Sequence, residues 1–337
     1  PDMEVVGSAR TGVEGLELLQ ATQPDVICTD LHMPQMDGFK FTAEVMATQP
    51  RPILVISASV QEEDRHNVFR LLDTGAVDIF PKPAMANVAE YAAIAHELLQ
   101  KIRVLAGVRV FTRRRPAQQV AAPPEPVLAP PTPTASAPPP LSLGVTSRYK
   151  ILAIGASTGG PQALKTLLSA LPATLPVPIL CVQHISEGFL QGLVDWLKPY
   201  CQLPIQLAAP GEYPQAGVIY FPREDLHLEL DQRGRFSYAS TAKMGGHRPS
   251  ITLAFQAVAK VYRSAALGVL LTGMGRDGAE GMLAIHRAGG YTIAQAEASC
   301  VVFGMPREAI ALGAAQQVLP IEAIAPALLS RLMYGAF

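Results

Sequence analysis

Short apolar runs alternate with segments of helical periodicity in the first part of the chain. The runs at residues 24–30 and 52–59 are rich in β-branched side chains and end in polar residues, as buried strands do. Three further segments carry apolar side chains at helical spacing, at residues 12–23, 38–49 and 62–75. Strands separated by helices predict a parallel α/β sheet.

The same alternation returns in the last part of the chain. Four apolar runs there have the length and composition of strands, at residues 149–157, 177–184, 217–222 and 265–275, and amphipathic helices follow several of them. This pattern predicts a doubly wound, mostly parallel, Rossmann-like sheet. In such sheets, functional residues lie outside the carboxyl ends of the strands.

A proline- and alanine-rich segment separates the two parts. Residues 116–140 contain a single charged side chain and cannot pack a core, so an extended conformation is expected. The chain has 337 residues, about twice the usual size of one domain. The sequence therefore predicts an N-terminal domain at residues 1–103, a linker at 104–147 and a second domain at 148–337.

Charge and cysteine content narrow the function classes. The formal net charge of −1 gives no overall field for nucleic acid or an anionic membrane, and no helix-turn-helix with a basic face follows the linker. No apolar run reaches about 18 residues, so membrane insertion is not expected. The four cysteines lie far apart without a CxxC pair, which argues against a disulfide framework or zinc site. A reducing, cytoplasmic location is therefore expected.

Three polar residues stand at predicted strand ends in the first domain. Asp30 ends one run and Ser57 another, while Lys82 follows a third short apolar stretch. A carboxylate, a hydroxyl and an amine at one sheet edge could hold a phosphoryl group, although an aspartate in such a loop is often only a helix N-cap.

The surrounding residues, "DLHMPQMDG", then "SA", then "KP", resemble the receiver domain of response regulators over about residues 1–86. The resemblance implies a flavodoxin-like fold, phosphorylation of Asp30 by a chemotaxis histidine kinase as phosphodonor, and Ser57 and Lys82 as switch residues. It also suggests a cis bond between Lys82 and Pro83.

This domain departs from the receiver pattern at its beginning. The first strand, with the acidic pair that holds Mg²⁺, is missing, and in the 2-1-3-4-5 order of the fold that strand is central. We therefore interpret the sequence as an N-terminally truncated receiver. Mg²⁺ for receiver phosphorylation would belong to the full-length protein, with Asp30 and the backbone carbonyl of His32 supplying only part of its site.

The second domain carries a candidate nucleophile. Residues 155–159, "GASTG", match G-x-S-x-G between a predicted strand and helix, where small residues permit a sharp turn that exposes Ser157. A nucleotide phosphate loop is the competing interpretation. It lacks the G-K-[ST] ending of a P-loop and the G-x-G-x-x-G spacing of a dinucleotide site.

A serine nucleophile needs a base and an orienting acid. His184 ends a predicted strand on the same rim as Ser157, whereas His227 and His286 lie inside predicted elements and look structural. Asp277 lies in the glycine-rich loop "LTGMGRDG" after another strand, where a helix N-cap is the alternative role. Ser157, His184 and Asp277 form a consistent candidate triad.

Five ordered motifs, "GASTGG", "QH", "HRPS", "LTGMGRDG" and "EASCVVFGMPREAI", resemble the catalytic domain of the chemotaxis protein-glutamate methylesterases over residues 148–337. The resemblance assigns the nucleophile, base and acid to the candidate triad. It adds Thr158 and the backbone N–H of Met274 as active-site supports, and His247 and Arg248 as substrate contacts.

That family resemblance implies a phosphorylation-regulated hydrolase that demethylates glutamate methyl esters on methyl-accepting chemotaxis receptors and deamidates receptor glutamines. Hydrolysis needs no cofactor or metal in the catalytic domain. The unphosphorylated receiver is expected to lie over the active-site entrance. Two rival hypotheses are a second domain that only binds a partner and a nucleotide-binding domain built on the "GASTGG" turn.

Overall fold

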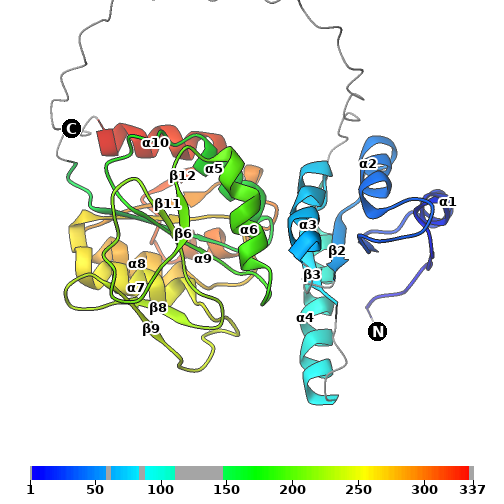
Figure 1. Ribbon diagram of the computed structural model, residues 1–337, viewed down its shortest axis with the longest axis horizontal. Helices are drawn as coiled ribbons and strands as arrows, with labels where there is room; N and C mark the ends of the chain where they lie inside the picture. Colours follow the sequence, from blue (N-terminus) through cyan, green and yellow to red (C-terminus); the bar gives the residue numbers. More distant parts are fainter. Residues whose placement is uncertain (1, 58–61, 83–87, 111–146, 334–337) are drawn as a thin grey trace, which may run out of the picture.

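The computed structural model describes residues 2–57, 62–82, 88–110 and 147–333, which form two α/β units (Figure 1). Most of the predicted linker, and the predicted cis bond at Pro83, lie outside the described residues.

The first unit is built on a parallel sheet of three described strands in the order β1-β2-β3. Asp37 accepts a hydrogen bond from the N–H of Lys40 and so begins helix α2 as its N-cap. Gly75 has a φ of +127° and follows the last residue of α3. The elements are α1 (Gly12–Thr22), β1 (Ile27–Thr29), α2 (Gly38–Thr48), β2 (Ile53–Ser57), α3 (Glu62–Thr74), β3 (Asp78–Pro81) and α4 (Val88–Ala106).

Strand β1 is an edge of this sheet within the described residues, since β2 alone pairs with it. The segment before α1 contains Val5 and Val6, whose side chains are 86% and 46% exposed, and it forms no strand. The described sheet therefore has three of the five strands that the flavodoxin-like order contains.

The end of α4 corrects the predicted domain boundary. The helix continues to Ala106, so the predicted linker start at residue 104 cuts into it. Leu105 is fully buried and packs with Leu54, Val77 and Phe80. Burial of this apolar side chain against the sheet keeps the last turn helical, and residues 104–106 belong to the first domain.

The second unit is a seven-stranded sheet in the order β12-β11-β10-β4-β5-β7-β6, with every neighbouring pair parallel. Strands β8 and β9 form a separate antiparallel pair. Its strands are β4 (Ile151–Ala156), β5 (Ile179–Gln183), β6 (Ile205–Leu207), β7 (Ile219–Phe221), β8 (His227–Leu230), β9 (Phe236–Ala239), β10 (Ala266–Leu270), β11 (Tyr291–Gln295) and β12 (Gln317–Leu319). Its α-helices are α5 (Gly160–Ser169), α6 (Leu190–Leu197), α7 (Ile251–Tyr262), α8 (Ala279–Arg287), α9 (Met305–Ala311) and α10 (Ile321–Met333).

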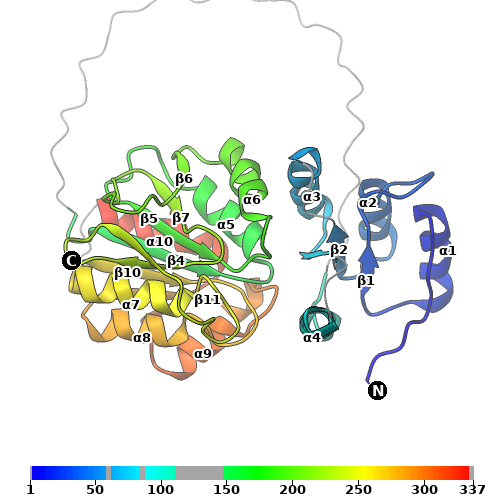
Figure 2. The ribbon, with the colours of Figure 1, turned by 60° about the horizontal axis from the view of Figure 1, so that its bottom comes forward.

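Successive side chains of β4 enter opposite cores, as the two-residue period of a strand requires. Leu152 and Ile154 pack in the core that includes α5, α6 and α10, whereas Ile151 and Ala153 pack in the core of α7, α8 and α9. Figure 2 shows these helices as layers on the two faces of the sheet. The doubly wound α/β fold predicted from the sequence is confirmed.

The strand order identifies where the site should lie. Strand β4 is central, the chain runs outward through β5 on one side, and it returns to β10 on the other. The crevice outside the carboxyl ends of β4 and its neighbours is the topological switch point of the sheet.

The two units contact each other through α3 of the first and α5 and α6 of the second (Figures 1 and 2). The carboxylate of Asp73 accepts hydrogen bonds from Lys165 Nζ at 2.7 Å, Trp196 Nε1 at 3.0 Å and Tyr200 Oη at 3.1 Å. The Phe69 ring lies 6.1 Å from the Trp196 ring. One carboxylate of the first unit thus connects three side chains of the second unit.

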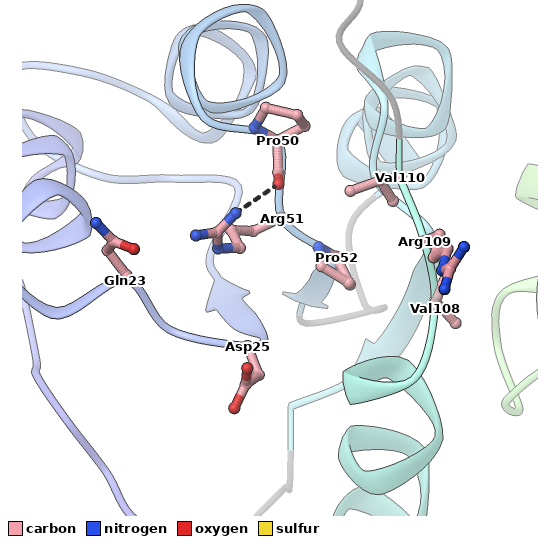
Figure 3. Close-up of a pocket in the computed structure, with 8 residues that line it drawn as sticks. All are labelled: Gln23, Asp25, Pro50, Arg51, Pro52, Val108, Arg109 and Val110. Carbon is pink, nitrogen blue, oxygen red and sulfur yellow. Dashed lines mark hydrogen bonds between the residues drawn. The ribbon is translucent and has the colours of Figure 1, made fainter.

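A hollow of about 340 Å³ lies at the amino ends of the first-unit strands (Figure 3). Pro52 and Asp25, which precede β2 and β1, line it, and neither Asp30 nor a member of the candidate triad does. The hollow therefore lies at the opposite end of the strands from the predicted phosphorylation site at Asp30. None of the helices in the described part of the chain combines the length and apolar character that a membrane crossing needs.

Candidate active site

Ser157 stands in the tight turn between β4 and α5. The surroundings of this turn are closely packed, because a Cβ on Gly155 would come within 2.3 Å of Ile251 and one on Gly159 within 2.5 Å of Val301. Gly159 also has a φ of +74°, which favours glycine. These glycines explain why the nucleophile turn needs small residues on both sides of the serine.

His184 lies beside Ser157 at the next strand end. Ala156 of β4 pairs with Gln183 of β5, and the N–H of His184 donates to the carbonyl of Ala156 at 2.9 Å. Neighbouring strands are about 4.8 Å apart. The residues that follow this register pair, Ser157 and His184, therefore leave the sheet side by side.

Gln183 fixes both turns, a role that was not predicted from the sequence. Its buried amide nitrogen donates to the carbonyl oxygens of Ser157 at 2.9 Å and His184 at 2.8 Å. A polar side chain at the end of an otherwise apolar strand was the signal for it. The Gln183 amide couples the backbone of Ser157 to that of His184.

Asp277 holds the imidazole of His184 by one edge. His184 Nε2 lies 2.8 Å from Asp277 Oδ2, and both side chains are 6% exposed. A carboxylate accepts only, so we assign the proton to Nε2. Nδ1 then carries the lone pair, and it is buried without a hydrogen-bond partner among the described residues. The nitrogen available as a base is Nδ1.

The Asp277 carboxylate is surrounded by donors from the start of α7. Ser250 Oγ and the N–H groups of Thr252 and Gly278 donate to Oδ1 at 2.9–3.0 Å, and the N–H of Ile251 donates to Oδ2 at 2.8 Å. Burial alone would raise the pKa of Asp277. The hydrogen bond and positive partial charge of His184, with the donors at Thr252 and Ile251, outweigh burial and hold that pKa well below its usual range. Asp277 remains a carboxylate.

This arrangement also settles the alternative role of Asp277 as a cap of the helix that follows it. The N-cap of α8 is Gly278, which makes no side-chain cap bond. Asp277 instead binds the first N–H groups of α7, a helix that precedes it in the chain. Anions are stabilised at helix N-termini, so α7 favours the charged form.

The loop after β10 approaches the nucleophile. A Cβ on Gly273 would lie 2.7 Å from the Ser157 Cβ, so a side chain has no room there. The N–H groups of the next residue, Met274, and of Thr158 donate to no backbone carbonyl among the described residues. Both are candidate oxyanion donors.

The motif at residues 297–310 supports that loop. Val302 exchanges backbone and side-chain hydrogen bonds with Gly273 and Thr272, and the N–H groups of Gly304 and Met305 donate to the carbonyl of Gly273. Cys300 is half-buried, and burial followed by the nearby Glu297 raises the pKa of its thiol to about 12. The motif builds the active-site loop, and its cysteine stays protonated.

The other histidines separate into two groups. His227 is fully buried, accepts from the N–H of Ser250 and contacts the carbonyl of Ala242, and His286 lies within α8. His247 instead stacks on the ring of His184, with ring centroids 3.8 Å apart. The predicted substrate contact therefore touches the candidate base directly.

The Arg248 guanidinium is hydrogen-bonded to two nearby residues of the second unit. Its Nε and Nη2 bond Asp225 Oδ1 at 2.9 and 2.7 Å, and Nη1 donates to the carbonyl of Thr241 at 3.0 Å. The guanidinium braces the loop that carries His247, which offers a structural role beside the predicted contact with substrate.

The predicted phosphorylation site lies at the carboxyl edge of the first sheet. Lys82 Nζ forms an ion pair with Asp30 Oδ2, and the N–H of Lys82 donates to the carbonyl of Ser57 at 2.8 Å. A Cβ on Gly38 would come within 2.4 Å of the Asp30 carbonyl, which explains the glycine in "MDG". Lys82 thus contacts the Asp30 carboxylate through its side chain and the Ser57 carbonyl through its backbone.

Metal binding at this edge lacks a full donor set. No cluster of three or more His, Cys, Asp or Glu side chains suited to a metal occurs within the described ranges. At the predicted phosphorylation site, Asp30 supplies a carboxylate that forms an ion pair with Lys82. The described residues do not by themselves fit a Mg²⁺ site.

Comparison with known proteins gives the same division of the chain. Residues 152–328 match the CheB methylesterase family, and residues 1–92 match the response regulator receiver domain. The chain is 39% identical over 328 residues to a protein-glutamate methylesterase/protein-glutamine glutaminase of Nitrosospira multiformis, covering 97% of this chain and 89% of that protein. A homologue from Pseudomonas aeruginosa, protein-glutamate methylesterase/protein-glutamine glutaminase 2, is 40% identical over 335 residues, with 98% and 90% covered.

A solved structure supports the assignment of the second unit. The Thermotoga maritima CheB methylesterase catalytic domain superposes with a TM-score of 0.53 at 37% identity, covering 54% of this chain and 98% of that domain. With its receiver, its strand-end serine, histidine and aspartate, and full-length similarity to such proteins, the chain belongs to the CheB methylesterase family of response regulators.

Proposed function

We propose that this protein is a serine hydrolase that demethylates glutamate methyl esters on chemoreceptors, releases methanol and also deamidates receptor glutamines. The observation that carries this proposal is the hydrogen bond between Asp277 and His184 Nε2. The other ring nitrogen, Nδ1, has no hydrogen-bond partner among the described residues and lies beside the Ser157 turn. The family of the chain supports the choice of substrate.

Acylation begins when His184 Nδ1 takes the proton of Ser157 Oγ as that oxygen attacks the γ-carbonyl carbon. This requires Ser157 Oγ to reach Nδ1 once substrate is bound. The carbonyl oxygen becomes an oxyanion, for which the N–H groups of Thr158 and Met274 are the candidate donors. One such donor is worth about 3–4 kcal/mol in comparable sites. The carbonyl then re-forms, the C–O bond to methoxide breaks, and His184 returns the proton to give methanol.

Deacylation repeats these steps with water. His184 Nδ1 takes a proton from water, the hydroxide adds to the acyl carbon, and the bond to Ser157 Oγ breaks as the oxygen regains a proton. The receptor glutamate is released. With a glutamine substrate the first leaving group is ammonia, and every later step is the same. Asp277 stays ionised and stabilises the imidazolium in both halves.

The receiver is proposed to control access to this site. A histidine kinase would supply the phosphoryl group to Asp30, with Ser57 and Lys82 contacting it. The contact at Asp73 supports a docked inactive state, and Val301, which packs against the receiver core, also contacts the turn at Gly159. New charge at Asp30 would bias the equilibrium between docked and undocked arrangements.

Two further expectations belong to this proposal. Phosphoryl transfer to the receiver aspartate would use Mg²⁺, for which Asp30 would supply one carboxylate, although the described residues alone do not complete such a site. We expect the enzyme to act in the cytoplasm, where a reducing environment keeps its four free cysteines as thiols.

The test is release of labelled methanol from membranes that contain methylated chemoreceptors. The parent chain and a Ser157→Ala variant are compared, with circular dichroism to show that both are folded. Release by the parent and not by the variant is expected. Equal release from both would contradict Ser157 as nucleophile, and tight nucleotide binding would favour the rival assignment of the "GASTGG" turn.

A further inference from the structure

The ring of His247 lies flat on the ring of His184. The centroids are 3.8 Å apart and the planes differ by 10°. Asp277 contacts the edge of the same His184 ring through Nε2. The imidazole that would act as base is therefore held at one edge by a carboxylate and covered on one face by a second imidazole.

A tight hairpin presents His247 to this position. Met244 and His247 exchange backbone hydrogen bonds of 3.1 and 3.0 Å, and the two residues between them, Gly245 and Gly246, have φ angles of +57° and +90°. Positive φ at both central residues is the two-residue turn that glycine favours. The pair "GG" before His247 thus has a local cause, and it fixes the direction in which the histidine leaves the backbone.

The segment after the hairpin is fixed by hydrogen bonds to Asp225 and to Asp277. Arg248 bonds Asp225 through two nitrogens, and Ser250, two residues later, donates its hydroxyl to Asp277. One short segment therefore carries the ring that stacks on His184 and a donor to the carboxylate that orients it. This segment therefore links the stacking contact on the His184 ring to the carboxylate that bonds the edge of that ring.

The charge state of His247 suits this place. Burial, followed by the proximity of His184, lowers the pKa of His247 to about 4; Lys101 and Lys243 act in the same direction, and Asp277 opposes them. A neutral ring results near neutral pH. The face of a neutral aromatic ring attracts a cation, so it accommodates the imidazolium that His184 becomes when it takes the serine proton.

A single hydrogen bond does not fix the plane of an imidazole. The bond from Nε2 to Asp277 lets the ring tilt about that contact, and Nδ1 has no partner among the described residues that would stop it. A flat neighbour at stacking distance supplies the missing restraint. We propose that His247 is a positioning residue, whose stacked ring holds the His184 imidazole in the plane that directs Nδ1 toward Ser157.

This inference rests on the proposed function, because it assumes that His184 is the base. It differs from the sequence-based expectation that His247 contacts substrate. A positioning residue affects kcat more than KM and is replaceable by another flat ring. A substrate contact through the imidazole nitrogens would affect KM and would be lost in phenylalanine.

The experiment compares His247→Phe with His247→Leu in the full chain. Met244→Ala is the matched control, since it changes the same hairpin at a side chain that is 41% exposed. The parent and a Ser157→Ala variant complete the set. Steady-state kcat and KM are measured for methanol release from methylated receptors, and p-nitrophenyl acetate serves as a second, receptor-independent ester.

We expect His247→Leu to lower kcat about 10- to 100-fold with KM within about twofold, and His247→Phe to keep kcat within about threefold of the parent. Met244→Ala should match the parent. Phe and Leu variants that lose kcat equally, or that raise KM at unchanged kcat, would overturn the positioning role while Ser157-dependent hydrolysis stands. A Ser157→Ala variant as active as the parent on both esters would instead overturn the proposed function itself.

Discussion

Asparagine at position 277 should abolish most activity by changing the tautomer of His184. The asparagine amide has one acceptor atom, whereas the Asp277 carboxylate has two. Five hydrogen-bond donors surround that carboxylate. The Oδ2 position faces His184 Nε2 and the N–H of Ile251, whereas the Oδ1 position faces Ser250 Oγ and the N–H groups of Thr252 and Gly278. The amide NH₂ must oppose donors in either orientation.

Counting the conflicts decides the orientation. With NH₂ at the Oδ1 position, the N–H groups of Thr252 and Gly278 both face a donor, because only the Ser250 hydroxyl can rotate to accept, although Gly278 keeps Thr252 Oγ1 as an acceptor at 2.7 Å. With NH₂ at the Oδ2 position, the N–H of Ile251 is the one backbone group that faces a donor, provided that His184 moves its proton from Nε2 to Nδ1, where Ser157 Oγ would have to accept it. The second orientation is favoured, and it removes the lone pair that would accept the proton of Ser157.

The expected magnitudes follow from these contacts. A wrong histidine tautomer costs roughly 10⁴-fold in kcat in a comparable triad. One buried unpaired N–H costs about 1–3 kcal/mol, and three bonds to a neutral oxygen replace bonds to a charged one. We therefore expect Asp277→Asn to lower the free energy of unfolding by about 2–4 kcal/mol relative to the parent while the variant remains folded at 25 °C.

The assay is methanol release under saturating substrate, with urea unfolding of the same preparations. Ser250→Ala is the matched control. It removes one donor to Asp277 and the N-cap of α7, which costs about 1 kcal/mol, but leaves the tautomer unchanged. Its kcat should fall less than tenfold. A folded Asp277→Asn variant that keeps more than about a tenth of the parent kcat would refute the tautomer argument.

Three other perturbations test separate parts of the structure. Gly273→Ala would place a Cβ 2.6–2.7 Å from Met305 Sδ and Ser157 Cβ. We expect kcat for methanol release to fall at least about 100-fold while the circular dichroism spectrum stays that of the parent. An active variant would show that this loop can move. Asp73→Ala removes the hydrogen-bond acceptor of Lys165, Trp196 and Tyr200. Loss of about 1–3 kcal/mol of docking free energy between the two units should raise unstimulated methanol release about tenfold. An unchanged basal rate would argue against inhibition by docking at α3. The folded-state pKa of His247 is about 4, below its ordinary 6.5, so protonation opposes folding as pH falls through this window. Between pH 7 and pH 4 the parent should lose up to about 3 kcal/mol of unfolding free energy relative to His247→Phe, measured by urea denaturation, and parallel curves would contradict the buried neutral ring.

Periodicity located the elements because it reflects burial that each segment must satisfy. The run at residues 149–157 became β4, whose alternate side chains fill two cores, and Gly75 ended α3 with the left-handed φ that glycine permits. The first domain was predicted to end at residue 103, three residues before the end of α4. Leu105 owes its helical conformation to burial against Leu54 and Phe80, and those contacts come from remote parts of the sequence.

Strand ends also located the candidate residues of the active site. Ser157, His184 and Asp277 each follow a strand, and parallel strands bring their carboxyl ends to one edge of the sheet. By contrast, the roles of Gln183 and Ser250 were not predicted. A glutamine in a strand and a serine before a helix are common, and their importance comes from partners more than 20 residues away in the chain.

The sequence by itself determined the two α/β units, the nucleophile turn and the residues at the sheet edges, because local propensity and burial period are properties of short segments. Only the tertiary structure decided which nitrogen of His184 bonds Asp277, which helix Asp277 caps, and that His247 covers the His184 ring. These depend on side chains from separate loops meeting at close range, 2.8 Å between His184 and Asp277 and 3.8 Å between the two imidazole rings, and no local pattern encodes such meetings.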